Sequence, residues 1–128
     1  MNFTKFFLTL APILAGISVA AGAFASHALK EQLDARSLEI WETGAKYQMY
    51  HAIALFIVAI LLLQTTNVES WLTSAGVAFI VGTVLFSGSL YALSLSGVKV
   101  LGAITPLGGV AFLIGWGCLA VSGWLLKP

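Results

Sequence analysis

Charged side chains are scarce in this sequence, and their scarcity excludes most soluble proteins. Lys, Arg, Asp and Glu together make up 9% of the 128 residues, whereas about 25% is usual in soluble domains. The six basic residues are scattered and the formal net charge is only +1, so no basic surface is available to replace the counterions of nucleic-acid phosphates. We therefore expect neither a soluble domain nor a nucleic-acid-binding protein.

Groups that carry out chemistry are also few. The single cysteine, Cys118, cannot form an intrachain disulfide. No Asp, Glu, Lys or Arg interrupts the long apolar segments, whereas ion-coupled transporters normally place such a group inside the membrane. No catalytic motif is present either. The sequence thus predicts a protein that is neither an enzyme nor an ion-coupled transporter, with no cofactor and no metal ion.

Long uncharged segments make up most of the chain. They are Phe6–Leu29, Tyr47–Val68, Ser70–Val98 and Val100–Leu126. Each reaches the roughly 20 residues that a helix needs to cross a bilayer, and none shows the alternating pattern of a barrel strand. The first is longer than the roughly 7–15-residue apolar core of a signal peptide, so we expect it to remain as a membrane helix. The expected fold class is all-α: a polytopic membrane protein with four transmembrane helices in a compact bundle.

Cap and turn residues predict the helix boundaries within a single domain, residues 1–128. We expect transmembrane helices at about 5–28, 47–66, 70–95 and 105–126. Asn67 and Ser70 are suitable caps for the third helix. Thr105 with Pro106 is a typical helix start, because a proline there lacks only a donor that would be unpaired anyway. Gly97–Ala103 is then a tight hairpin between the last two helices.

Polar residues concentrate in one segment between the first two apolar runs. Within residues 35–46, apolar and charged side chains recur at helical spacing on neighbouring faces. This pattern is typical of a short amphipathic helix at the membrane interface, which we expect to continue into the second transmembrane helix. The apolar face carries Leu38, Trp41 and Ala45, and the charged face carries Glu39, Glu42 and Lys46.

Small residues recur at helical spacing within the apolar segments. In lipid, there is little hydrophobic force between helices, so close approach through small side chains supplies the packing. We therefore predict that these residues pack helix against helix and do not hold a ligand. They are Ser18, Gly22 and Ser26 in the first helix, Ser74, Ala78 and Gly82 in the third, and Ala111 and Gly115 in the fourth.

Polar residues near one membrane surface form a candidate binding patch. His27 lies near the end of the first helix and His51 near the start of the second, so a hairpin would bring both to the same side. An ionisable group within the membrane is a candidate site by default; alternatively, the two histidines are interfacial anchors. The complete candidate patch comprises His27, Glu42, Tyr47, Gln48, His51, Ser87, Ser89, Tyr91 and Thr105.

Sharper chemical assignments remain as alternatives. The two histidines could ligate a haem iron from both sides. A zinc site would need a third ligand such as Glu42 and a more regular spacing. A serine nucleophile at Ser87 or Ser89 would lack the base and the orienting group of a hydrolase triad.

Four motifs carry a resemblance to a known family. They are Gly22–Leu29, Glu42–Ala52, Phe86–Tyr91 and Ile104–Gly109, to which Gly115 and Trp116 can be added. In combination they resemble the bacterial family called domain of unknown function 423, which is similar to eukaryotic transmembrane protein 256. The resemblance covers nearly the whole chain. It implies a small integral protein of the bacterial cell membrane with four helices, and it does not indicate what the molecular activity is.

The function that these observations favour is the binding of a small or lipidic ligand, or of a partner membrane protein, through the candidate patch. A passive scaffold and a histidine-based redox or metal-binding protein are the alternatives. The expected partners are the lipid bilayer and either a second copy of the chain or another membrane protein. The orientation stays open. Four basic residues on the side of the first and third loops against two on the other favour termini outside the cell, but basic C-terminal tails in relatives favour the opposite.

Overall fold

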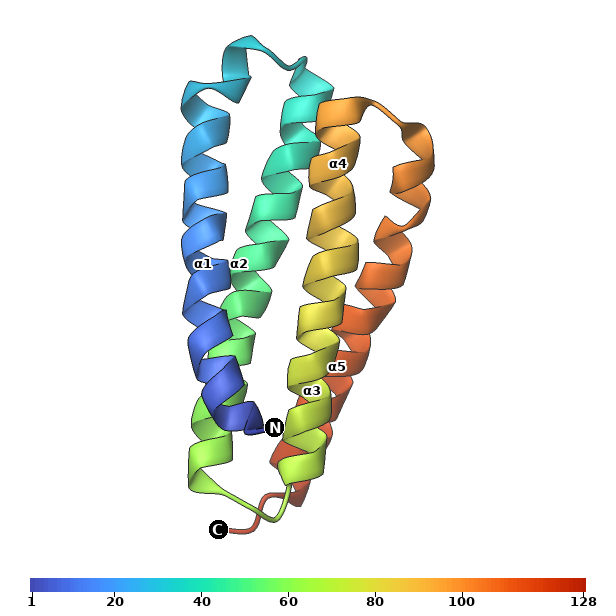
Figure 1. The fold of residues 1–128 in the computed structure, drawn as a ribbon. Coiled ribbons are helices and arrows are strands. Elements are labelled where there is room, and N and C mark those ends of the chain that lie inside the picture. Colours follow the sequence, from blue (N-terminus) through green and yellow to red (C-terminus); the bar gives the residue numbers. More distant parts are fainter.

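The structure is a set of four long antiparallel helical spans (Figure 1). It is a computed structural model and describes residues 1–128. The spans are α1, Phe3–His27; α2, Ala35–Gln64; α3 followed by α4, Glu69–Gly82 and Gly88–Ser96, joined by the π-helical segment Thr83–Ser87; and α5, Thr105–Leu125, preceded by the 3₁₀ segment Lys99–Ala103. All four are long and apolar enough to cross a membrane. The expected all-α class with four transmembrane helices is confirmed.

Helix α2 combines two of the elements expected from the sequence. The expected interfacial helix, residues 35–46, and the expected second span, residues 47–66, form one continuous helix that ends at Gln64. Asp34 caps its start by accepting a hydrogen bond from the Ser37 amide at 2.7 Å. This hydrogen bond lowers the pKa of Asp34 from its ordinary value of 3.8, because it stabilises the ionised carboxylate.

Two predicted helix caps have other roles in the structure. Val68 is the N-cap of α3 and makes no side-chain cap bond, whereas the Asn67 amide donates to the carbonyl of Leu125 at 3.0 Å and ties the loop to the end of α5. Thr105 is already the first residue of α5, after Ile104 as N-cap. Its hydroxyl bonds to Ser89 instead of capping the helix. Both cap predictions were wrong, because these side chains form hydrogen bonds with partners that are distant in the sequence.

Through the π-helical segment, the α3–α4 span contacts both α2 and α5 at the same level of the bundle. The wider turn ends with the Gly88 amide bonded to the Thr83 carbonyl. Ser87 within it faces α2 and donates to the Gly44 carbonyl at 2.7 Å. The preceding residue, Phe86, brings its backbone against Gly108 of α5, where no side chain would fit. Such π turns are frequent at functional sites.

The four spans lie in a chain of pairwise contacts and not around one common axis. The main contacts are α1 with α2, α2 with α3 and α4, and α3 with α5, so α2 and the α3–α4 span are central (Figure 1). The outer spans are correspondingly less buried, at 22% for α1 and 17% for α5 against 39% for each of the central two. The surfaces of α1 and α5 are therefore left to lipid or to partners.

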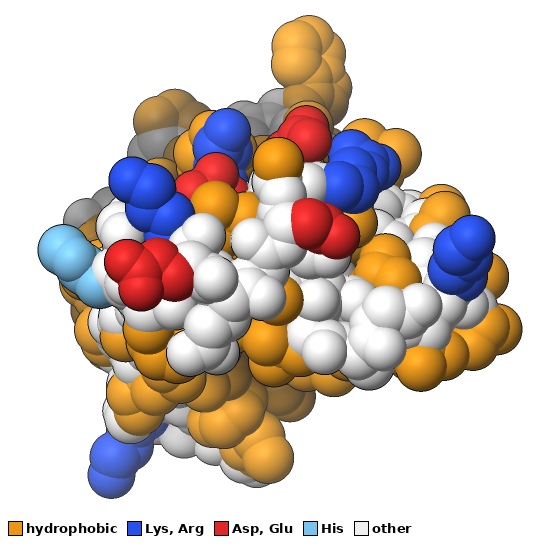
Figure 2. Space-filling view, turned by 90° about the horizontal axis from the view of Figure 1, so that it is seen from above, with side chains coloured by type: hydrophobic (Ala, Val, Ile, Leu, Met, Phe, Trp, Pro, Cys, Tyr) orange, Lys and Arg blue, Asp and Glu red, His pale blue; other side chains and the backbone are white.

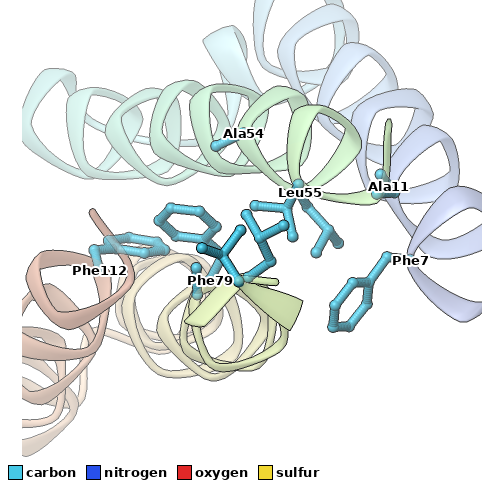
Figure 3. Close-up of a cluster of buried hydrophobic side chains, with 11 residues drawn as sticks. Phe7, Ala11, Ala54, Leu55, Phe79 and Phe112 are labelled. Atoms are coloured by element: carbon cyan, nitrogen blue, oxygen red, sulfur yellow. The ribbon is translucent and has the colours of Figure 1, made fainter. Parts of the chain in front are cut away.

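Aromatic side chains resting on glycines build the core between the spans. Phe7 of α1 is fully buried and lies against Gly76 of α3, and Figure 3 shows it reaching from α1 toward that helix. Around it, the central helices contribute a continuous cluster of buried apolar side chains. Its largest fully buried side chains are Phe7, Phe79, Leu55, Leu72 and Val58.

Helices α3 and α5 pack through two reciprocal pairs. Phe79 of α3 lies on Gly115 of α5, and Phe112 of α5 lies on Gly82 of α3. A Cβ atom at Gly115 would come within 2.6 Å of the Phe79 ring, so this crossing requires glycine. Both glycines belong to the small-residue stripes that the sequence predicts as packing positions.

Other members of those stripes do not meet a neighbouring helix closely. Gly22 has no atom within 4 Å of the place that a Cβ would take. The Ser26 hydroxyl is exposed and bonds to the Gly22 carbonyl of its own helix. Ser18, by contrast, is buried and donates to the Ala45 carbonyl of α2 at 2.5 Å. The upper part of the α1 stripe therefore faces outward. Ala78 and Ala111 are half-buried, on an outer furrow between α3 and α5.

The two ends of the bundle differ in charge. Both termini lie at the same end, at the bottom of Figure 1. The opposite end carries the α1–α2 connection and the start of α2, and Figure 2 shows acidic and basic side chains intermixed there. This mixture contains no large field of one sign. The charged residues of these segments and of the α4–α5 connection are Lys30, Glu31, Asp34, Arg36, Glu39, Glu42, Lys46 and Lys99.

Candidate functional site

A groove of about 800 Å³ lies between α2 and α5. It exists because these two helices pack on α3 and not chiefly on each other. Phe86 of the π-helical segment contributes to its wall, and Gly109 of α5 leaves its side open. No charged residue lines it. Six of its 11 lining residues carry aromatic rings: Tyr47, Tyr50, His51, Phe86, Phe112 and Trp116.

His51 is the central polar residue of the groove. Its Nδ1 lies 2.7 Å from the carbonyl of Tyr47, which can only accept, so Nδ1 carries the proton. Its Nε2 lies 3.0 Å from the Trp116 indole nitrogen, which can only donate, so Nε2 is the acceptor. The hydrogen bonds thus specify a neutral imidazole with a defined tautomer.

Aromatic contacts hold the His51 ring in place. The ring stacks on Phe112 at a centroid distance of 3.5 Å and an interplanar angle of 7°. Phe79 and Trp116 approach it at 5.6 and 5.7 Å. Only 5% of the His51 residue is exposed. With both nitrogens bonded and one face covered, His51 has a single orientation.

The two histidines do not share a site. The α1–α2 hydrogen bonds pair Leu14 with Gln48 and Ser18 with Ala45, which places residue 11 or 12 of α1 opposite His51. His27 is exposed at the end of α1, about 15 residues further along, or about 22 Å at the rise of an α-helix. The predicted common patch is wrong for this pair. The hairpin was correct, but α2 starts at Ala35 and carries His51 far below the connection.

A second polar cluster, the three-helix belt, comprises Ser18, Trp41, Gln48, Ser87 and Tyr91. Gln48 is its centre, because its amide donates to the Leu14 carbonyl of α1 and accepts from the Tyr91 hydroxyl of α4, both at 2.8 Å. Ser18 and Ser87 bond to α2 carbonyls, and the Trp41 indole donates to the Ala21 carbonyl at 2.9 Å. Interhelical hydrogen bonds of this kind hold membrane helices together.

The belt is fully engaged and offers little to a ligand. The Tyr91 ring packs on Trp41 at 4.7 Å, and it lies over Gly44, where a Cβ would be 3.0 Å away. The Gln48 and Ser87 side chains are buried. Because each polar group of the belt has an internal partner, its role is to fix the register of three helices.

The remaining members of the predicted patch lie elsewhere. Ser89 and Thr105 form a hydroxyl pair at 2.6 Å between α4 and the start of α5. Glu42 is exposed on the outer face of α1 and α2, beside Lys46 in a shallow surface depression. The predicted patch thus divides into the groove, with Tyr47 and His51; the belt; the hydroxyl pair; and two exposed residues, His27 and Glu42.

The α5 side of the groove was not among the sites predicted from the sequence. Trp116 and Phe112 supply the hydrogen bond and the stacking partner of His51, and neither was among the candidates. A signal was present, because Pro106, Val110, Leu113 and Trp116 follow helical spacing and face the groove together.

The side chains do not support a metal site of ordinary composition. No group of three or more His, Cys, Asp and Glu lies close enough to hold one ion. The distance between His27 and His51 also prevents both from ligating one haem iron. The serine hydroxyls bond mainly to main-chain carbonyls and have no neighbouring histidine base.

Comparison with known proteins now identifies the family. The family described as "Protein of unknown function (DUF423)" matches residues 21–109, which include α2, α3, α4 and the start of the groove on α5. The chain belongs to this family. The resemblance stated from the four motifs is confirmed.

Relatives are similar over nearly their whole length. UPF0382 membrane protein YwdK of Bacillus subtilis is 47% identical over 118 residues, covering 92% of this chain and 95% of the relative. UPF0382 inner membrane protein YgdD of Escherichia coli is 38% identical over 124 residues, with 97% and 93% covered. A UPF0382 membrane protein of Haemophilus influenzae is 41% identical, with 94% and 95% covered. No solved structure matches the chain significantly. The protein is a member of a family of membrane proteins of unknown molecular function.

Proposed function

We propose that this membrane protein binds a lipidic ligand in the α2–α5 groove and catalyses no reaction. The observation that carries the proposal is the groove itself: an apolar hollow of about 800 Å³ with one oriented polar side chain, His51, in its wall. Small-molecule sites are typically concave and mostly apolar, with a few fixed polar groups.

Access from the bilayer supports a membrane-soluble ligand. Three lining residues on the rim are largely exposed: Tyr50 by 51%, Val110 by 55% and Leu113 by 72%. They lie on spans that cross the membrane, so their exposed faces contact lipid. A ligand can therefore enter sideways from the hydrocarbon without leaving the membrane.

The chemistry of the lining favours binding over catalysis. A general base needs a free lone pair within reach of a substrate proton, whereas both nitrogens of His51 are engaged by Tyr47 and Trp116. The groove contains no carboxylate, amine or thiol. Tyrosine hydroxyls are its only other polar side-chain groups, apart from the Trp116 indole, and they suit recognition of a ligand.

We also place the protein in the bacterial cytoplasmic membrane. The support is the Escherichia coli relative, which is named an inner membrane protein and whose match covers 97% of this chain. A second copy or another membrane protein could cover the outer faces of α1 and α5, the least buried spans; binding of such a partner is the second candidate function.

A glycine pair on α5 provides the test. Gly109 lines the groove and Gly117 does not, and at both positions the space that a Cβ would take has no atom within 4 Å. Gly109→Leu should therefore place a side chain in the groove with no clash at its Cβ atom, and Gly117→Leu is its matched control. Native mass spectrometry of the full chain extracted from its own membranes should show a retained small molecule in the parent and in Gly117→Leu. It should be lost from Gly109→Leu.

Three other results would each change the conclusion. A bare protein mass in all three samples would leave the scaffold role as the better account. Equal retention in all three would place the ligand outside the groove. A discrete second mass of protein size would favour the partner-binding function.

A further inference from the structure

The absence of charged residues from the groove restricts the ligand that it can bind. All 11 charged residues of the chain lie outside the lining. An ionised headgroup inside the groove would lose its hydration without gaining a partner of opposite charge, which is strongly unfavourable. The part of the ligand that enters the groove is therefore uncharged.

The rings in the lining restrict the ligand further. Tyr47 and Phe86 are 4.7 Å apart between centroids, and Phe86 and Phe112 are 5.4 Å apart, so the rings form one connected wall. The outer furrow between α3 and α5, about 400 Å³ in volume, has no ring in its lining. A depression in this bundle therefore does not require aromatic side chains. A wall of rings offers stacking and edge contacts to a planar ligand beyond the burial of its area.

Two tyrosines that line the groove have hydroxyl groups available to such a ligand. Of the three tyrosines, only Tyr91 uses its hydroxyl in a hydrogen bond within the protein. The side chains of Tyr47 and Tyr50 both line the groove and pack edge to face at 5.7 Å. Their O–H groups can donate to acceptor oxygens, and carbonyl oxygens on a planar ring are acceptors that need no charge.

Resting on the proposed function, we infer that the ligand of the α2–α5 groove is a quinone with a hydrocarbon tail. Its ring packs against the aromatic wall, its carbonyl oxygens accept hydrogen bonds from Tyr47 and Tyr50, and its tail leaves past Leu113 into the bilayer. The inference concerns binding alone and includes no electron transfer.

The test compares three probes with the same decyl chain: decylubiquinone, decanol and decanoate. Each is titrated into the purified full chain in nonionic detergent, and complexes are counted by native mass spectrometry. We expect decylubiquinone to bind about 3- to 10-fold more tightly than decanol, the effect of one or two ring contacts, and decanoate to bind no more tightly than decanol. Removing both hydroxyls, with Tyr47→Phe and Tyr50→Phe together, should weaken quinone binding several-fold and leave decanol binding unchanged.

Groove-filling variants give the location. Gly109→Leu should abolish quinone binding, and Gly117→Leu should not. Leu113→Trp, at a largely exposed rim position, is a second blocking variant in case the first fails to fold. Equal binding of decanol and quinone, both blocked by Gly109→Leu, would overturn the quinone assignment and leave the lipidic function intact. Quinone binding that survives both blocking variants would overturn its placement in the groove. Binding of none of the probes, together with an empty protein from native membranes, would overturn both.

Discussion

Replacing Gly82 by alanine should destabilise the protein through a single aromatic ring. The added methyl group would overlap Phe112, which already lies on Gly82. Phe112 cannot simply turn away, because the His51 ring stacks on it at 3.5 Å and is itself held by two hydrogen bonds. The strain must therefore spread into the α3–α5 contact and the groove.

The expected loss follows from two opposing effects. Overpacking of a close contact costs about 1–3 kcal/mol, whereas exchanging glycine for alanine inside a helix contributes up to about 1 kcal/mol of stability. We expect Gly82→Ala to lower the free energy of unfolding by about 1–2 kcal/mol. At Gly117, where nothing lies within 4 Å, only the favourable effect operates, so Gly117→Ala should be neutral or stabilising.

Reversible unfolding in mixed detergent, followed by circular dichroism, measures both changes. Phe112→Leu removes the ring, so it should relieve the strain: in a double-mutant cycle, Gly82→Ala and Phe112→Leu should show a coupling of at least about 0.5 kcal/mol. Gly97→Ala is unsuitable as a control, because Gly97 has a φ of 69° and a side chain there is strained. An unchanged unfolding free energy for Gly82→Ala, together with zero coupling, would refute the reasoning.

Four further outcomes are expected. Gln48→Leu should cost about 1–3 kcal/mol in the same unfolding assay, because it leaves two half-buried partners, the Leu14 carbonyl on α1 and the Tyr91 hydroxyl on α4, without a bond; no loss would remove the belt as a structural element. The effects of His27→Ala and His51→Ala should add within about 0.5 kcal/mol, since the sites are far apart, and a larger coupling would contradict the register. The capping hydrogen bond lowers the pKa of Asp34. The contribution of Asp34 to the free energy of unfolding is therefore complete above the unfolded-state pKa and is lost as pH falls through the folded-state pKa. Melting temperatures below about pH 4 should fall less in Asp34→Asn than in the parent. Cysteines at positions 2 and 127, in a chain without the native cysteine, should be labelled from the same side of the membrane, and opposite labelling would rule out four crossings.

Local patterns were enough to predict the membrane class and the number of spans. Each uncharged run is long enough to cross a bilayer on its own, so a window of about 20 residues contains the whole signal. The same holds for the start of α5 near Pro106, whose position differs from the prediction by no more than a residue. Two glycines predicted from spacing, Gly82 and Gly115, also lie at close helix contacts.

The orientation of the first part of α2 could not be predicted from the local sequence. The amphipathic pattern of residues 35–46 describes which faces are polar, but it does not say whether this helix lies along the interface or points away from the membrane. In the structure it is the first part of α2. The hydrogen bonds from Trp41 and Gln48 to carbonyls of α1 keep this part of α2 alongside α1.

The sequence by itself determined that this protein resides in a membrane and crosses it with four helices, because transfer into lipid depends on the composition of each segment alone. Only the tertiary structure decided which polar residues meet. His51 pairs with Trp116, 65 residues away, and not with His27. Such partners depend on the rotation and the relative depth of packed helices, and these are set jointly by glycine–aromatic contacts and the π-helical segment, which no single segment specifies.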